Sequence, residues 1–337
     1  MSWGIFGAAL AAGAVCTWLV RAFALRAGIV NRPTGLVPQH TRPVAYLGGV
    51  GVAAGLACAL ALVQLRAPAW PWLVGGALFT AIGLVDDLRP FSPRGKLLLQ
   101  VAGAVVAVAW GLPHPVAGIA GWLLAVLWIV LLVNAVNVTD VCDGLVGGLA
   151  VVAFVALGLW DDSIRLPALA AAGATAGFLV FNRPNASIFL GDAGSHLLGF
   201  TWAAFTLEAA RGLPLWPAAP QMLLLAGVPL FETAFLIAQR RKKGLAWWRG
   251  SPDHFSLRLQ AAGLGKLGTD LIAWTAAALL ALAAFALDGP APRASLVLAL
   301  AVAGLAAAWR MLLRWEVPPR AAQPREPRPL VSGELMR

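Results

Sequence analysis

Carboxylates and a lysine lie where apolar stretches of this 337-residue chain end or begin, in places where they could do chemistry. Two adjacent acids, Asp86 and Asp87, close one stretch, and Lys96 opens the next. A lysine at a helix start opposes the helix dipole, which favours a role for Lys96 in binding an anion. Neighbouring helical residues point about 100° apart. One of the two acids can therefore line a cavity while the other orients a loop or a base.

A second polar series follows another apolar stretch. Asn134, Asn137, Asp140 and Asp143 recur at every third position, and Gly144 comes next. In a helix the first three present hard oxygen ligands towards one side, and Mg²⁺ is usually held by one or two such groups with phosphate and water oxygens. Asp143, before a glycine turn, is free to bind a nucleoside. The alternative is that Asp143 is only the N-cap of the next helix, which explains one residue but not the series.

Two further segments contain candidate residues. Asp192 lies in a glycine-flanked turn at a predicted helix start, where it is either a simple cap or a metal ligand. Phe189 could stack on a base or could be an ordinary core residue. A later polar segment adds Arg249, His254 and Arg258, which could bind phosphates or a sugar.

The composition decides what kind of protein positions these residues. Apolar residues make up 60 % of the chain and charged residues 12 %, whereas a soluble domain carries about 25 % charged residues. This excludes a soluble enzyme and indicates a polytopic membrane protein. Three cysteines are too few for a disulfide framework. The first apolar segment has no positively charged region before it, so we interpret it as a retained membrane helix.

Apolar runs of membrane-spanning length predict an all-α bundle of about 11 (10–11) transmembrane helices in a single domain, 1–316, followed by a disordered tail, 317–337. Gly51 and Gly55 are either a small-residue helix contact or flexible filler. The predicted spans are 3–24, 47–65, 70–86, 96–111, 117–134, 145–160, 165–181, 194–209, 219–239, 268–287 and 293–314.

The basic residues predict the orientation of this bundle. One set of loops holds four arginines, and the other set, with the tail, holds the remaining 21 of the 25 Lys and Arg residues. The positive-inside rule makes the second set cytoplasmic and the N-terminus external. The candidate acids then lie together on the cytoplasmic side. The net charge of +10 is explained by topology, so nucleic acid is not needed as a partner.

Four motifs on this one side resemble the polyprenyl-phosphate N-acetylhexosamine-1-phosphate transferases, the MraY, WecA and TagO group of glycosyltransferase family 4. The resemblance covers residues 30 to 260, and eleven helices are closer to WecA than to MraY. The motifs are Asn31-Arg-Pro with His40-Thr-Arg-Pro43 and Gly48-Gly49; Asp86-Asp87 with Lys96 and Gln100; Asn134, Asn137, Asp140 and Asp143-Gly144; and Phe181-Asn182 with Phe189-Leu-Gly-Asp192-Ala-Gly-Ser195.

The resemblance implies catalytic and metal-binding roles. Asp192 is expected to be the principal ligand of Mg²⁺, with Mn²⁺ as the alternative ion, and Asn137 is expected to be a second ligand. Asp86 is expected to contact or deprotonate a lipid phosphate with support from Asp87. Lys96 is expected to neutralise the donor pyrophosphate.

The resemblance also implies the substrate-binding residues. Asp143, Asn182 and Phe189 are expected to hold uridine, and Asp140 to line the pocket. Arg249, His254 and Arg258 lie where the family carries its sugar-recognition loop. Asn134 and His40 complete the substrate-binding set.

The implied activity is transfer of a phospho-N-acetylhexosamine, GlcNAc-1-phosphate in the first place, from a UDP-sugar to polyprenyl phosphate, with release of UMP. It would begin a cell-envelope glycan at the bacterial inner membrane. The nearest alternative is an MraY-type phospho-MurNAc-pentapeptide transferase, against which the single histidine of the last loop argues. A multipass transporter is the second alternative, although repeated halves are not evident. A homodimer is left open.

Overall fold

The computed structural model describes residues 2–31, 43–61 and 70–317. These ranges are almost entirely helical, apart from the short antiparallel strands β1 (Val30–Asn31) and β2 (Val44–Ala45). The helices are α1 (Ser2–Arg26), α2 (Gly48–Ala61), α3 (Trp70–Leu88), α4 (Pro93–Ala109), α5 (Gly118–Thr139), α6 (Leu145–Trp160), α7 (Arg165–Asn182), α8 (Gly191–Ala209), α9 (Leu215–Leu225), α10 (Gly227–Lys242), α11 (Phe255–Ala261), α12 (Lys266–Ala286) and α13 (Ala291–Leu312).

Local sequence explains where two of the helices begin. The Ser92 hydroxyl accepts a hydrogen bond from the backbone N–H of Gly95 at 3.1 Å, and Pro93 occupies the first position of α4. Both features favour a helix start. Gly144, before α6, has φ of +81°, in the left-handed region that glycine adopts without steric cost. These two starts fix the chain next to the polar residues at 96 and 143.

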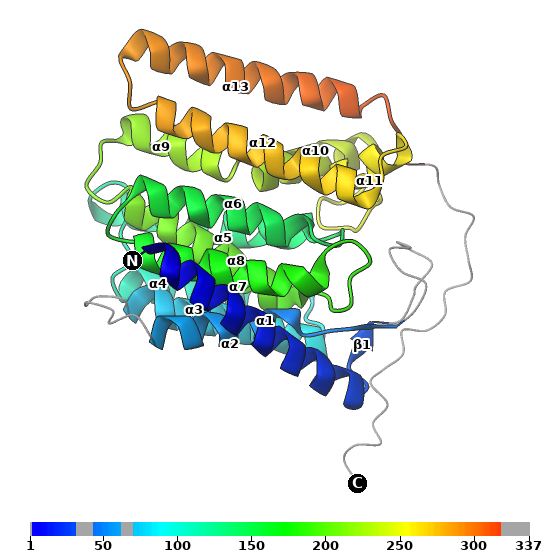
Figure 1. The fold of residues 1–337 in the computed structure, drawn as a ribbon. Helices are drawn as coiled ribbons and strands as arrows, with labels where there is room; N and C mark the ends of the chain where they lie inside the picture. Colours follow the sequence, from blue (N-terminus) through cyan, green and yellow to red (C-terminus); the bar gives the residue numbers. More distant parts are fainter. Residues whose placement is uncertain (1, 32–42, 62–69, 318–337) are drawn as a thin grey trace.

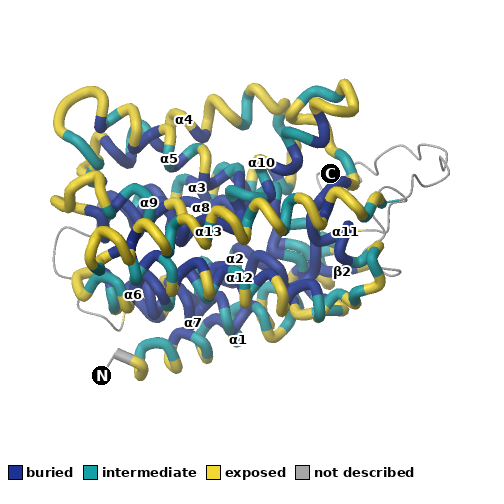
Figure 2. The backbone as a smooth tube through the Cα atoms, turned by 90° about the horizontal axis from the view of Figure 1, so that it is seen from above, coloured by how far each residue is buried: buried dark blue, intermediate teal, exposed yellow. Residues whose placement is uncertain are grey.

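The helices lie side by side, with α13 at one edge of the bundle and α1 to α4 towards the other (Figure 1). α8 runs through the interior and packs against α3 and α5. It buries 17 of its 19 residues, and the two that are not buried are Asp192 and Glu208. The same central helix is dark blue in Figure 2, whereas α13 and α4 expose long stretches. An acid in the first turn of such a helix is placed at the edge of the core.

Small residues bring α1 and α2 into close contact. A Cβ atom added to Gly55 would lie 2.5 Å from the Cα of Gly13, and one added to Gly51 would lie 2.8 Å from the Cα of Thr17. Such distances leave no room for a side chain, so both glycines are needed for the helices to approach. The interpretation of these glycines as a helix contact is therefore confirmed, and the interpretation as flexible filler is wrong.

Five helices of the described ranges are long and apolar enough to cross a membrane, namely α1, α3, α5, α12 and α13. The pair α9 and α10 would make a sixth span, although the two helices are bent by 72° relative to each other. Only 6 % of the apolar window of α13 is buried, so its leucines and alanines face outwards. A helix that is apolar on an exposed face is stable against lipid and not against water. The chain is a multi-pass membrane protein.

Within the described residues, ten of the eleven predicted segments each fall on one helix and the ninth falls on two, which confirms the nearly all-α fold. The ninth prediction, 219–239, is interrupted at Ala226, where α9 ends and α10 begins. The short strands were not predicted. The number of membrane crossings stays a prediction, because several of the remaining helices are shorter than an ordinary span.

One end of the bundle gathers loops from distant parts of the sequence. Figure 1 shows β1, α11 and the end of α13 at the end opposite the N-terminus. β2 lies here as well, because it pairs with β1, and Ala45 forms a parallel bridge with Ile188. The Phe189 N–H donates to the Ala45 carbonyl at 2.9 Å. The segment before α2 and the segment before α8 are thus joined where α8 begins.

Candidate active site

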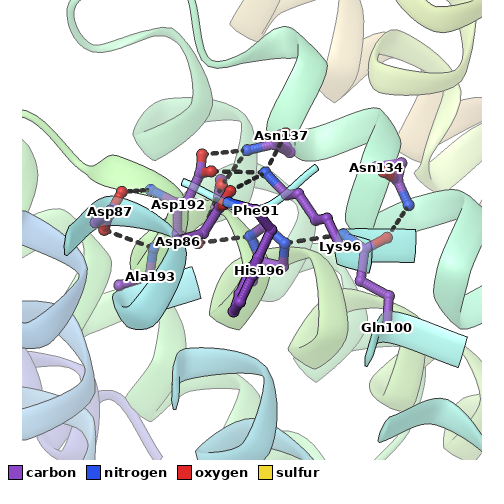
Figure 3. A network of polar contacts seen from close by, with 11 residues as sticks. Asp86, Asp87, Phe91, Lys96, Gln100, Asn134, Asn137, Asp192, Ala193 and His196 are labelled. Carbon is purple, nitrogen blue, oxygen red and sulfur yellow. Dashed lines mark hydrogen bonds and ion pairs between the residues drawn. The ribbon is translucent and has the colours of Figure 1, made fainter. Parts of the chain in front are cut away.

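Lys96 lies at the centre of a polar cluster to which four helices contribute (Figure 3). Its Nζ lies 2.9 Å from Asp86 Oδ2 of α3 and 2.6 Å from Asp192 Oδ2 of α8. It also donates to Asn137 Oδ1 of α5 at 3.5 Å. We call Asp86, Lys96, Asn137 and Asp192 the Lys96 cluster. The four-helix convergence at one ammonium group is the arrangement that a bundle uses to build a site.

Asp192 is the more accessible acid of this cluster. Its side chain is 28 % exposed, against 8 % for Asp86. Asn137 Nδ2 donates to Asp192 Oδ1 at 2.7 Å, so both carboxylate oxygens are held. Leu190 precedes α8, and no side chain of this helix caps it. The simple-cap alternative for Asp192 is therefore wrong, and its carboxylate is directed at the cluster.

Asp87 supplies the missing cap from another helix. Its two carboxylate oxygens accept hydrogen bonds from the backbone N–H groups of Asp192, at 2.7 Å, and Ala193, at 3.0 Å. A carboxylate at a helix N-terminus stabilises the otherwise unpaired N–H groups and the dipole. The close approach of α3 requires Gly83, where an added Cβ atom would lie 2.2 Å from the Asp192 carbonyl oxygen. Asp87 thus positions Asp192 and supports the site.

The oxygen donors of the cluster fit a small hard cation. Within the described residues no group of three or more His, Cys, Asp or Glu side chains forms a ready-made metal site. Mg²⁺ does not need one, because one or two carboxylates with phosphate and water oxygens usually hold it. The Asp192 carboxylate and the Asn137 amide oxygen provide such a partial set. They lie beside Lys96, a further cation for phosphate oxygens.

Asp140 lies in the turn that follows α5. Desolvation raises the pKa of this carboxyl to about 8, and the charges of Asp192, Asp87 and Asp143 add to the shift. The Asp140 carboxyl therefore holds its proton to a higher pH than an ordinary aspartate. The charges of these four acids act on one another, so the acids lie near one another. That Asp140 lines the substrate pocket stays a prediction.

Asp143 is paired with a lysine that sequence reasoning missed. Lys266 Nζ lies 2.8 Å from Asp143 Oδ2, and the Ala186 N–H donates to the same oxygen at 3.3 Å. The residue before α6 is Gly144, and no side chain caps that helix. The N-cap alternative for Asp143 is therefore wrong. Lys266 is the first residue of α12, so the signal that identified Lys96, a lysine at a helix start, could have found it.

Asn182 holds two loops together. Its Oδ1 accepts from the Gly144 N–H at 3.0 Å, and its Nδ2 donates to the Ile188 carbonyl at 2.9 Å. Phe189, the residue after Ile188, is half-buried. The structure shows Asn182 fixing the segment that carries Phe189; the uridine contacts expected of both residues stay predictions.

Asn134 lies one helical turn before Asn137. Its Nδ2 donates to Gln100 Oε1 at 2.7 Å and to its own helix at the Val130 carbonyl, at 2.8 Å. It is thus connected to the Lys96 cluster through α4. The remaining expected substrate residue of the N-terminal half, His40, lies outside the described residues.

The last polar segment folds into the protein. His254 Nδ1 lies 2.6 Å from Glu232 Oε1, and Arg258 lies 2.8 Å from Asp253, with side-chain exposures of 9 % or less throughout. We call Glu232, Lys243, Asp253, His254 and Arg258 the Arg258 cluster. Arg258 also donates to the backbone carbonyls of Leu312 and Trp315, at 3.1 and 2.9 Å.

The charges of this second cluster are matched internally. Burial alone would raise the pKa of Asp253, but hydrogen bonds from Lys243 and Arg258 outweigh it and hold the pKa below its ordinary value. Arg249, in contrast, is exposed. Of the three residues expected to recognise the sugar, His254 and Arg258 are thus directed into the fold, and only Arg249 presents its side chain outwards.

Two other buried groups had no predicted role. His196 is 0 % exposed and contacts the Asp192 carbonyl, and Glu232 is 1 % exposed and contacts His254. A signal existed for Glu232, because an acid inside an apolar segment suggests function. His196 could be recognised from the sequence only as a polar residue one turn after Asp192.

Comparison with known proteins identifies the family of this chain. The profile of the Glycosyl transferase family 4 matches residues 69–210. The probable undecaprenyl-phosphate N-acetylglucosaminyl 1-phosphate transferase of Bacillus subtilis strain 168 is 31 % identical over 275 residues, which are 74 % of this chain and 75 % of that protein. The chain belongs to glycosyl transferase family 4.

Other relatives in the family carry different names. The undecaprenyl-phosphate alpha-N-acetylglucosaminyl 1-phosphate transferase of Escherichia coli K12 is 28 % identical over 78 % of each chain. The phospho-N-acetylmuramoyl-pentapeptide-transferase of Synechococcus sp. strain RCC307 is 33 % identical over 68 % of this chain and 72 % of that protein. The family profile spans α3 to α8, which contain the Lys96 cluster, and ends before the Arg258 cluster.

Proposed function

We propose that this family 4 protein transfers a phospho-N-acetylhexosamine, GlcNAc-1-phosphate in the first place, from a UDP-sugar to polyprenyl phosphate. A phosphate oxygen of the lipid attacks the β-phosphorus of the UDP-sugar. The bond between that phosphorus and the bridging oxygen breaks, and UMP leaves with the bridging oxygen. The observation that carries the proposal is the Lys96 cluster, in which a lysine, two acids and an amide from four helices meet.

The residues of the cluster divide the work of bringing two anions together. Lys96 neutralises phosphate charge, and its position between two carboxylates keeps it at the reaction site. Phosphoryl transfer depends mainly on such positioning and charge neutralisation. The lipid phosphate is already largely ionised near pH 7, because its second pKa is about 6. The main role of Asp86 is therefore to position Lys96 and the lipid phosphate, and deprotonation of the lipid phosphate is secondary.

The divalent cation of the proposal is Mg²⁺. Asp192 and Asn137 would hold it, and when bound it would supply positive charge against the pyrophosphate and the departing UMP. Asp87 keeps Asp192 in place through the start of α8. Asp140, whose pKa is raised by burial and by the neighbouring acids, would face the donor substrate. Asp143 with Lys266 lies on the side that we assign to the nucleoside.

The membrane supplies the second substrate. We assign the protein to the bacterial inner membrane, with eleven crossings and the Lys96 cluster on the cytoplasmic side. The distribution of basic residues supports this orientation. Polyprenyl phosphate would then reach the cluster laterally from the inner leaflet, and the UDP-sugar from the cytosol.

The test is a UMP-release assay on the purified full-length protein in detergent. We expect UMP only when a UDP-sugar, undecaprenyl phosphate and Mg²⁺ are all present, with UDP-GlcNAc the best of a panel that includes UDP-GalNAc and UDP-MurNAc-pentapeptide. Mass spectrometry of the lipid identifies the sugar. Absence of UMP with every donor would refute the proposal.

The pentapeptide donor is the one alternative that a specific observation favours, namely the 33 % identity to the Synechococcus protein. The same panel decides between the two donors. A transporter is less well supported, since the described residues contain one bent helix pair and not broken helices in two corresponding halves.

A further inference from the structure

Two buried polar side chains next to the Lys96 cluster take no part in the transfer as proposed above. Gln100 lies on α4, one turn after Lys96, and His196 lies on α8, one turn after Asp192 (Figure 3). Both are 0 % exposed. Burying an amide and an imidazole costs free energy unless their polar atoms are paired. Their hydrogen bonds therefore indicate what they are for.

The contacts of His196 fix its protonation state. Nδ1 lies 2.6 Å from the backbone carbonyl oxygen of Asp192. A carbonyl only accepts, so Nδ1 carries the hydrogen. Nε2 lies 2.9 Å from the amide nitrogen of Gln100, which only donates, so Nε2 accepts. The ring is therefore neutral and in the Nδ1–H tautomer.

The Val130 carbonyl fixes the orientation of the Asn134 amide, at the other end of this chain of hydrogen bonds. Asn134 Nδ2 donates to Gln100 Oε1 at 2.7 Å and to the Val130 carbonyl at 2.8 Å, which uses both of its hydrogens. Turning either amide over would place donor against donor or acceptor against acceptor. The hydrogen bonds thus run in one direction, from Asn134 through Gln100 and His196 to the Asp192 carbonyl. We call these three side chains the His196 relay.

The relay completes the hold on Asp192. Asp87 binds the Asp192 N–H, Asn137 binds Oδ1 and Lys96 binds Oδ2. His196 binds the remaining polar atom, the backbone carbonyl oxygen. With all four atoms held by other side chains, neither the peptide nor the carboxylate of Asp192 can turn without breaking a contact.

We propose that Gln100 and His196 are positioning residues, which fix Asp192 for the metal and leave Asn134 only its oxygen to offer to a substrate. The inference rests on the proposed function. It also defines the ligand chemistry at Asn134, since an oxygen that only accepts selects a hydroxyl or an amide N–H of the donor substrate and not a phosphate.

The first test needs neither metal nor substrate. Nitrogen-15 NMR of the full-length protein labelled at histidine gives the tautomer of each ring, and the His196→Gln variant assigns the signal of His196. We expect a neutral Nδ1–H ring from pH 6 to 8, which loses this single tautomer in Gln100→Met. An Nε2–H ring or an imidazolium in the wild type would overturn the proposal.

The second test separates positioning from general stability. Gln100→Met keeps the volume of the side chain and removes the relay. We expect UMP release to fall 10–100-fold, as for other groups that orient metal ligands. The Mg²⁺ concentration for half-maximal thermal stabilisation should rise about tenfold, with little change in the KM for the UDP-sugar.

The matched control is Thr206→Val, also on α8. Thr206 is 0 % exposed and accepts a hydrogen bond from Trp128 at 2.9 Å, so its loss lowers stability without touching Asp192. Its Mg²⁺ half-saturation should equal that of the wild type. If Gln100→Met behaves like Thr206→Val, the positioning role is refuted. A wild type that releases no UMP would refute the proposed function instead, and the tautomer would still decide the relay.

Discussion

The Lys96 cluster and the interior of the Arg258 cluster contain similar residue types and differ in accessibility, whereas Lys243, at the edge of the second cluster, is 45 % exposed. In the first, the Asp192 side chain is 28 % exposed and that of Lys96 is 18 % exposed. In the second, Arg258 and Asp253 are 1 % and 2 % exposed, and the arginine is used on two backbone carbonyls and on the face of Phe235, 5.2 Å away. Charges that a ligand can reach can be neutralised by it; closed charges can only hold the fold.

The difference teaches that a basic loop need not be a binding loop. Arg258 connects α11 with the last turn of α13 through Leu312 and Trp315. α13 has few other polar attachments to the body among the described residues. The Arg258 cluster therefore keeps the outermost helix in place, while the Lys96 cluster remains available for anions.

The largest effect should come from Asp192. In Asp192→Asn one held negative charge disappears while the shape of the side chain is kept, so UMP release should fall by at least about 10²–10³-fold. The control is Asp162→Asn, since this acid is 83 % exposed and pairs with Arg165 on the surface. Near-wild-type turnover of Asp192→Asn would contradict the functional role that the comparison assigns to the Lys96 cluster.

Arg258→Met should cost stability and leave chemistry intact. Removing one partner of a buried ion pair destabilises by about 3–5 kcal/mol, because the other charge stays buried. Lys243, 2.7 Å from Asp253, should keep the loss near the lower end. Thermal unfolding in detergent measures the loss, with the exposed Arg310→Met as the control.

The same variant tests the boundary between the clusters. We expect the KM for the UDP-sugar to stay within about threefold of the wild type, because the Arg258 side chain is 1 % exposed and donates to Asp253 and two backbone carbonyls. A tenfold rise in KM with unchanged unfolding would make the Arg258 cluster part of the sugar site, and the comparison would fail.

Much of the fold was predictable from apolar run length, since ten of the eleven predicted segments each lie on one helix within the described residues. The kink at Ala226 was not, because a break inside an apolar run changes neither hydropathy nor length. In the site, the acids were predictable from their position at helix ends, where an unpaired charge is costly. Their partners were harder to find: that Asp87 caps α8 depends on α3 and α8 touching at Gly83, a contact between residues more than a hundred positions apart.

His254 and Arg258 show most clearly what could not be predicted from the sequence, namely the direction of a side chain. His254 and Arg258 looked like ligands because type and spacing do not reveal direction. Whether a histidine points outwards depends on Glu232, 22 residues away on another helix. The sequence carries that pairing only as two polar residues in different segments.

Asp86→Asn should have an intermediate effect. The Phe91 N–H and Lys96 both contact this carboxylate, at 2.6 and 2.9 Å, so an amide in its place weakens the hold on Lys96. We expect a 10–100-fold fall in UMP release. If the role of Asp86 is to position Lys96, raising the pH to 9 does not restore UMP release in Asp86→Asn. Full recovery at raised pH would identify Asp86 as the base. The Lys96 cluster would then differ from the Arg258 cluster by carrying out proton transfer and not by accessibility alone.

Asp140→Asn should have the smallest effect on UMP release, and its consequence appears in the pH dependence of stability. The pKa of Asp140 is about 8 in the folded protein and about 3.9 in an unfolded chain. The folded state therefore binds this proton more tightly, and the stability it provides is complete below pH 4 and is lost as the pH rises towards 8. The loss is at most about 1.4 kcal/mol per pH unit. The wild type should thus lose more thermal stability than Asp140→Asn between pH 5 and 8 in Mg²⁺-free buffer. Parallel curves would mean that Asp140 is ionised in the folded protein, which would make the Lys96 cluster more negative than the comparison assumes.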